Sequence, residues 1–223
     1  MSAAPESQPC RIFIGEQAEQ ELSRMGLRER YFHNAITVGN ERRERCGPTH
    51  PRPYQGYVMW AETLAHFRME CLALAQDWKM GHADNYETIF NLSRKLAIAV
   101  VGGDTNTGIQ GFDDPMTARP RGPITQLRVK RNYRGQAMLP GMPKSSAENS
   151  EDDCETWFFL VNGRENRLYS ELALPILMGK SQRVSRYAKR ILFDPIELGD
   201  VAVTPVEPDE GPEDETTVHV GRK

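Results

Sequence analysis

The sequence of 223 residues predicts an α+β fold, with an N-terminal helical part that contains an antiparallel helix pair and a small C-terminal antiparallel sheet. Three observations lead to this prediction. Apolar residues recur at helical spacing in the first hundred residues, and an aromatic, β-prone run begins near residue 156. A polar stretch rich in proline and glycine separates these two parts.

The chain accordingly divides into five segments. Residues 1–9 form a polar leader, residues 10–110 a mainly helical part, and residues 111–155 a connecting segment that is first basic and then acidic. Residues 156–198 form a small β-rich part that packs on the helices, and residues 199–223 form an acidic tail. Since both ends are poor in bulky apolar side chains, we expect the leader and the tail to be disordered.

Two helices are predicted before residue 47, over about 16–25 and 27–46. The second ends in three basic residues, which suit the negative end of the helix dipole: Arg42, Arg43 and Arg45. The next ten residues, 47–56, contain three prolines and two glycines. We therefore expect residues 47–56 to be an extended connection.

The antiparallel helix pair is predicted over 57–80 and from about Asp84 to Val100. In the first helix, seven apolar residues recur at steps of three and four: Tyr57, Trp60, Leu64, Phe67, Cys71, Leu74 and Trp78. Gly81 ends this helix, and Asp84 with Glu87 matches a capping box that starts the next one. The second helix continues one apolar face: Ile89, Leu92, Leu96 and Val100.

The C-terminal part changes to the periodicity of strands. Residues 156–161 (TWFFLV) and 167–174 are predicted strands, and the Asn-Gly pair at 162–163 is a turn signal. A four-residue loop places Phe159 opposite Leu168, which is a better match than the two-residue alternative. Residues 181–193 are compatible with a helix or with a strand.

The cysteines and the hydropathy pattern exclude several classes of protein. Four scattered cysteines show no paired spacing, so we expect neither a disulfide scaffold nor a zinc site: Cys10, Cys46, Cys71 and Cys154. No apolar run is long enough to span a membrane or to form a signal-peptide core. The sequence therefore predicts a soluble, cytoplasmic protein.

Motifs for catalysis or cofactor binding fail on inspection. The run VGGDTNTG at 101–108 resembles a phosphate loop only in its glycines, because Gly111, Pro115 and Pro120 follow where a helix is required. Against a calcium-binding loop, Ile109 and Pro115 stand where a glycine and an acidic ligand are needed. We therefore predict no metal, no cofactor and no enzymatic activity, although a site assembled only in the fold is an alternative.

A basic segment offers the best candidate site. Residues 118–144 carry seven basic and no acidic side chains, and the next eleven residues carry five acidic and no basic ones. Arginine and lysine neutralise phosphates, and an aromatic ring can stack on an unpaired base. The predicted nucleic-acid-binding residues are Arg119, Arg121, Arg128, Lys130, Arg131, Tyr133 and Arg134.

The leading hypothesis is a non-enzymatic protein that binds DNA or RNA through phosphate contacts made by this extended, exposed segment. One alternative is that the seven bases pair with the acidic residues of 148–155 or of the tail. Another is a protein-interaction adaptor or regulatory subunit that uses the helix pair or the tail. The sequence predicts no membrane partner and leaves the oligomeric state open.

Overall fold

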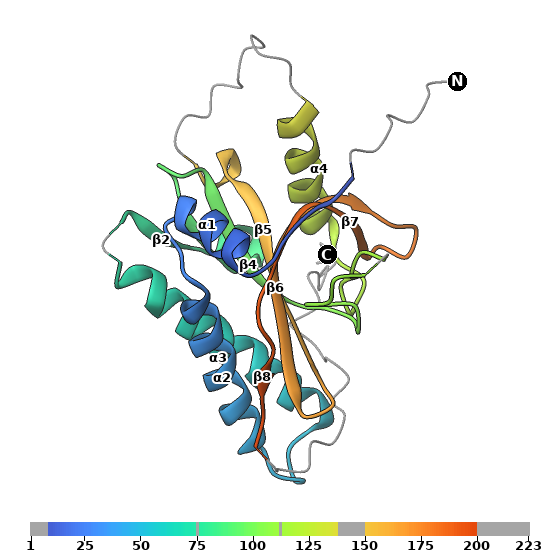
Figure 1. Cartoon of the computed structure of the whole chain (residues 1–223). Coiled ribbons are helices and arrows are strands. Elements are labelled where there is room, and N and C mark those ends of the chain that lie inside the picture. The colour runs from blue at the N-terminus through green and yellow to red at the C-terminus, as the bar shows by residue number, and fades with distance from the viewer. Residues whose placement is uncertain (1–8, 75, 112, 138–149, 200–223) are drawn as a thin grey trace, which may run out of the picture.

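The computed structural model describes residues 9–74, 76–111, 113–137 and 150–199 (Figure 1). These residues form a mixed sheet with the strand order β1-β7-β6-β5-β4-β3-β2, and β8 pairs with β6 beside this path. The strands are β1 (Arg11–Phe13), β2 (Trp78–Gly81), β3 (Thr88–Asn91), β4 (Leu96–Gly102), β5 (Glu155–Arg164), β6 (Arg167–Met178), β7 (Val184–Leu192) and β8 (Ile196–Glu197). The helices are α1 (Glu16–Arg24), α2 (Glu29–Glu44), α3 (Arg52–Leu72) and α4 (Pro123–Ala137).

Helices cover both faces of the sheet, and the side chains of β5 show how the two faces are divided. Trp157 and Phe159 point into a core shared with α1, α2 and α3, whereas Phe158 and Leu160 point into a second core that includes Val129 of α4. Because successive side chains of a strand alternate between faces, a strand covered on both sides is apolar throughout.

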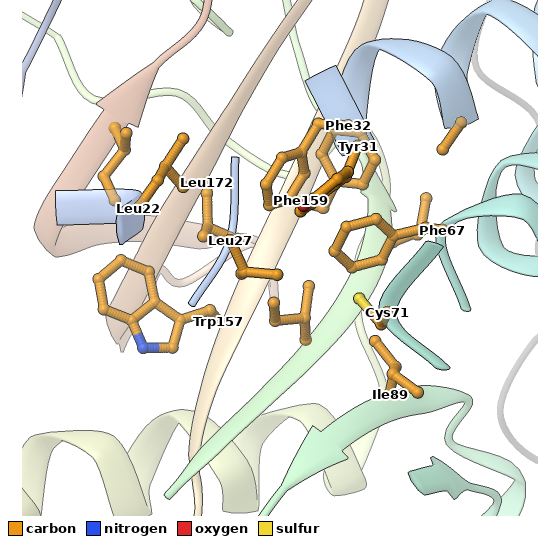
Figure 2. Close-up of a cluster of buried hydrophobic side chains, with 14 of the residues drawn as sticks. Leu22, Leu27, Tyr31, Phe32, Phe67, Cys71, Ile89, Trp157, Phe159 and Leu172 are labelled. Atoms are coloured by element: carbon orange, nitrogen blue, oxygen red, sulfur yellow. The ribbon is translucent and has the colours of Figure 1, made fainter. Parts of the chain in front are cut away.

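The first core centres on aromatic rings packed in tilted and edge-to-face arrangements (Figure 2). Phe32 of α2 lies 4.7 Å from Phe67 of α3 and 4.9 Å from Phe159 of β5, measured between ring centroids. Phe67 and Trp78 are buried as their spacing in the sequence suggested. Trp60 is only partly buried, and its indole N–H donates to the Val100 carbonyl at 3.1 Å.

The predicted fold is wrong in its architecture. The sheet is large and mixed rather than small and antiparallel, since β4 pairs with β5 and β1 pairs with β7 in parallel. Parallel neighbours need a crossover connection, and α4 lies in the one between β4 and β5. The basic segment, predicted to be extended, therefore contains a helix of 15 residues.

The antiparallel helix pair exists, but it is formed by α2 and α3 rather than by 57–80 and 84–100. Asn34 of α2 donates to Glu70 of α3, and Arg42 lies near Glu62, so the two helices run in opposite directions. Helix α3 begins at Arg52 and ends at Leu72, so the second half of the predicted extended connection is helical. A proline in the first turn, Pro53, is compatible with a helix.

Residues 78–102 are strands where helices were predicted. Gly81 does not end a helix but pairs with Thr88 across β2 and β3, and a Cβ at Gly81 would come within 2.2 Å of the Thr88 hydroxyl. Asp84 lies in a short 3-10 turn with φ of 57° instead of capping a helix. Apolar residues of β3 and β4 match helical spacing only because β4 is buried on both faces.

The β5–β6 hairpin turns later than predicted. Arg164 pairs with Arg167, and Phe159 pairs with Leu172 rather than with Leu168. The two turn residues, Glu165 and Asn166, have φ of 50° and 59°, the left-handed conformation that matches strand twist in a two-residue hairpin. Residues of the ambiguous stretch 181–193 form β7.

The predicted leader, 1–9, and tail, 199–223, lie outside the described residues except for Pro9 and Gly199. Among the helices that the structure describes, none is long and apolar enough to cross a membrane.

Candidate nucleic-acid interface

Helix α4 is held on the sheet largely by polar contacts. Thr125, Arg128, Val129 and Asn132 form its buried face. The Asn132 amide donates to the carbonyls of Thr156 at 2.8 Å and Pro175 at 2.9 Å, and its oxygen accepts from the Thr156 N–H at 2.9 Å. These bonds fix the helix against β5 and β6 and determine which of its basic residues face solvent.

Arg128 is buried rather than exposed. Its guanidinium is 3% exposed, donates to the Glu151 carboxylate at 2.7 Å, and lies 4.6 Å from the centre of the Tyr86 ring. The hydroxyl of Thr88 donates to the same carboxylate oxygen at 2.7 Å. The positive charge of Arg128 is therefore neutralised inside the protein, where it stabilises the fold.

Arg131 is also paired within the protein. Both of its terminal nitrogens donate to the Asp152 carboxylate, in a pair that is partly exposed to solvent. The alternative that acidic residues of 148–155 neutralise the basic segment is thus confirmed for Arg128 and Arg131. The basic run of the sequence thus belongs to a helix, and the acidic run that follows contains a short turn whose carboxylates pair with that helix.

The remaining predicted residues divide into three groups. Lys130 and Tyr133 are exposed, and the exposed fraction of Tyr133 is 40%. Arg119 and Arg121 are partly buried, and the Arg121 backbone N–H donates to the Gln182 carbonyl at 2.8 Å. The side chain of Arg134 lies outside the described residues. Among the described side chains of the predicted set, Lys130 and Tyr133 are the ones that lie on an open face of α4.

A second surface with exposed arginines lies where α2 passes into α3. Residues 41–62 contain four arginines and three glutamates, a net charge of +1. Arg42 and Arg45 at the end of α2 and Arg52 at the start of α3 are exposed. Because α2 and α3 pack antiparallel, their joined ends place these three arginines at one end of the molecule (Figure 1).

Aromatic rings accompany these arginines. The rings of His50 and Tyr54 are stacked, with centroids 4.9 Å apart and planes 4° from parallel. The Gly47 N–H donates to the His50 ring at 3.1 Å and holds it in place. Tyr54 and Tyr57 are 41% and 44% exposed. We call Arg42, Arg45, His50, Arg52, Tyr54 and Tyr57 the arginine–tyrosine surface.

Acidic side chains near this surface neutralise it only weakly. Glu62 approaches Arg42 to 3.9 Å in an exposed pair, and such pairs contribute about 0–1 kcal/mol. Glu44 accepts a hydrogen bond from Asn40 at 2.7 Å and lies 3.9 Å from Arg43. Burial lowers the pKa of Arg43, which lies on the inner side of α2 and is not part of the exposed surface. The exposed arginines thus keep their charge available.

The most deeply buried charges lie elsewhere, beneath the loop that follows β4. Arg190 and Glu171, both fully buried, are joined by bonds of 2.9 and 2.7 Å. Burial raises the pKa of Glu171, while the bonds from Arg190 and from the Gly108 N–H oppose this effect. Arg190 also donates to the Ile109 carbonyl at 3.0 Å, so this pair anchors the loop.

The same loop contains the residues considered for a phosphate or metal site. Asp104 accepts a hydrogen bond from the N–H of Asn106 at 3.0 Å, so its carboxylate organises the turn. Within the part of the chain that the structure describes, no three histidine, cysteine or acidic residues are grouped to hold a metal ion.

Sequence reasoning singled out the longer basic stretch and missed the arginine–tyrosine surface. The signal was present, because four arginines alternate with His50, Tyr54 and Tyr57 over 42–57. The prolines and glycines of residues 47–56 obscured it, because they favour an extended connection. Comparisons with protein-family models, with curated proteins and with solved structures found no match to this chain.

Proposed function

We propose that this chain is a non-catalytic protein that binds single-stranded nucleic acid through the arginine–tyrosine surface. The observation that carries the proposal is the combination of three exposed arginines with two exposed tyrosines at one end of the packed α2–α3 pair. Arginines neutralise backbone phosphates, and aromatic rings stack on bases that are not paired.

The proposal favours a single strand over a duplex because the tyrosine rings offer flat faces for stacking. Stacking of a base on an aromatic side chain contributes about 1–3 kcal/mol, and every base has such a face. His50 stacks on Tyr54 and so limits the freedom of this ring before any ligand binds. A ring that is already ordered loses less conformational entropy on binding.

The outer face of α4 is the weaker candidate. Lys130 and Tyr133 are exposed there, and they are the members of the sequence-predicted set that are placed to contact a ligand. However, Arg128 and Arg131 on the same helix are already paired with Glu151 and Asp152. We therefore assign α4 at most a secondary contact with the same strand.

The test compares two triple variants by fluorescence anisotropy with labelled single strands of about 20 nucleotides, DNA and RNA, and with a duplex of equal length. Changing Arg42, Arg45 and Arg52 to alanine removes three phosphate contacts. For single strands this lowers the log-log slope of affinity against salt by about 2 units. A separate Tyr54→Leu variant weakens binding but leaves the slope unchanged, because stacking releases no counterions.

The matched control changes three arginines that are exposed elsewhere: Arg11, Arg24 and Arg28. This triple variant has the same net charge as the first and is expected to keep most of the affinity. Both triples alter only surface side chains, so each substitution changes stability by no more than about 0.5 kcal/mol. Equal loss of binding in both triples, or no binding of the wild type at about 50 mM salt, contradicts the proposal.

A further inference from the structure

The described chain ends beside the arginine–tyrosine surface. Strand β8 pairs with β6 at the hairpin, with Glu197 opposite Arg167. The Leu198 N–H donates to the Asn166 carbonyl at 2.8 Å, and the Asn166 amide donates to the Gly199 carbonyl at 3.3 Å. Gly199 is thus tied to the tip of the β5–β6 hairpin.

The hairpin tip in turn lies next to the end of α2. The Arg43 guanidinium lies 3.9 Å from the position that a Cβ on Gly163 would take. Figure 1 shows the end of β8 beside the connection between α2 and α3. Residues after 199 therefore leave the folded part of the chain next to the exposed arginines.

The charge of these residues is opposite to that of the surface. Residues 200–223 contain seven acidic and two basic side chains, a net charge of −5, and the two basic ones are the last two residues. The three exposed arginines of the surface are Arg42, Arg45 and Arg52. The acidic segment also contains three prolines, Pro205, Pro208 and Pro212, and proline rings pack well on aromatic side chains such as tyrosine.

We propose that residues 200–223 dock on the arginine–tyrosine surface of their own chain and compete with nucleic acid for it. The docking is inferred from where the segment begins and from its charge. Only its competition with nucleic acid rests on the proposed function. A segment of this length spans about 27 Å as a flexible chain and about 36 Å as a helix, so it reaches the surface in either state. Tethering gives it an effective concentration of about millimolar, which compensates for weak individual contacts.

The docking is electrostatic and is therefore weakened by salt. At about 0.1 M salt, interactions between exposed charges fall off over about 10 Å, so only acidic residues close to the arginines contribute. Nucleic acid carries a denser charge than the acidic segment and displaces it when present in excess. The segment thus acts as a built-in competitor that rejects weakly bound, non-specific polyanions.

The decisive experiment uses the full chain and a neutral-tail variant, in which the seven acidic residues of 200–223 are replaced by their amides. Two-dimensional NMR at low salt is expected to show different amide shifts at residues 42–57 in these two proteins. The differences are expected to vanish at about 0.5 M salt, where screening is strong. Identical spectra over 42–57 at low salt overturn the docking, whatever the nucleic-acid measurements show.

A reciprocal control uses the triple variant Arg42→Ala, Arg45→Ala and Arg52→Ala. In that background the neutral tail is expected to cause no further shift at residues 42–57, because the partner charges are gone. Shifts that persist there show that the three arginines do not hold the acidic segment and overturn the assignment.

Binding of the same labelled single strands then tests the competition. The neutral-tail variant is expected to bind about three- to ten-fold more tightly at low salt, because the acidic segment no longer covers the surface in a fraction of the molecules. Equal affinity of both proteins overturns competition but leaves the proposed function intact. Absence of oligonucleotide binding in both proteins, together with salt-sensitive NMR shifts, overturns the proposed function while supporting the docking.

Discussion

Replacing Arg128 by alanine is the sharpest test of how α4 is used, because the sequence placed this residue on an exposed loop. In the structure Arg128 is 3% exposed and donates to Glu151 at 2.7 Å, and Glu151 is itself buried. Arg128→Ala leaves the Glu151 carboxylate with the Thr88 hydroxyl as its remaining hydrogen-bond partner among those described here. Breaking a buried pair in this way costs about 3–5 kcal/mol, a large part of the stability of a typical domain.

Lys130→Ala is the matched control, since it removes a cation from the same helix at an exposed position. We expect this variant to change the free energy of unfolding by at most about 0.5 kcal/mol. Urea unfolding followed by circular dichroism measures both variants. Glu151→Gln completes a double-mutant cycle with Arg128→Met, with an expected coupling above about 1 kcal/mol. If Arg128→Ala lowers the free energy of unfolding no more than Lys130→Ala does, the buried ion pair is refuted. The charge of Arg128 would then be available on the surface of α4.

Two further predictions concern the core and the response to acid. Phe67 is fully buried, and its ring centre lies 5.5 Å from that of Phe159. We expect Phe67→Ala to lower the free energy of unfolding, measured in urea, by about 3–5 kcal/mol. A Phe67→Ala variant as stable as the wild type would show that this ring lies on a surface. Burial alone would raise the pKa of Glu87, but hydrogen bonds from Arg68 and His82 outweigh it and hold this pKa below its usual value of 4.5. Its contribution to stability is therefore present above about pH 4.5 and is lost as the pH falls through the folded pKa, so thermal unfolding of Glu87→Gln is expected to depend less on pH in this acid range.

The N-terminal helices were predictable because each carries its apolar residues on one face and ends at clear signals. The predictions 16–25 and 27–46 correspond to Glu16–Arg24 and Glu29–Glu44. Strands β3 and β4 could not be predicted in this way, because a strand covered on both faces has no alternation of apolar and polar residues. Its apolar residues then fit a helical spacing by chance, and only the tertiary structure decides between the two.

Helix α4 escaped prediction for the opposite reason. Its inner face is formed largely by polar residues, Thr125, Arg128 and Asn132. Arg128 is bonded to the acidic turn, and Asn132 is bonded to β5 and β6. A helix that packs by hydrogen bonds has no apolar stripe for a sequence pattern to detect. The basic residues of such a helix look like a solvated, extended segment until their buried partners are known.

The location of the candidate site follows from where charge is left unpaired rather than from where basic residues are most numerous. Residues 118–144 contain seven basic residues, yet in the described part of the structure Arg128 is paired with Glu151 and Arg131 with Asp152. At the α2–α3 junction, by contrast, Glu62 and Glu44 approach the arginines only at 3.9 Å. Arg42, Arg45 and Arg52 are exposed at this junction, and exposed positive charge attracts a polyanion at long range, which is why we place the candidate site there. The acidic segment 200–223 begins beside these arginines, and under the proposed docking a phosphate ligand competes with it for the surface.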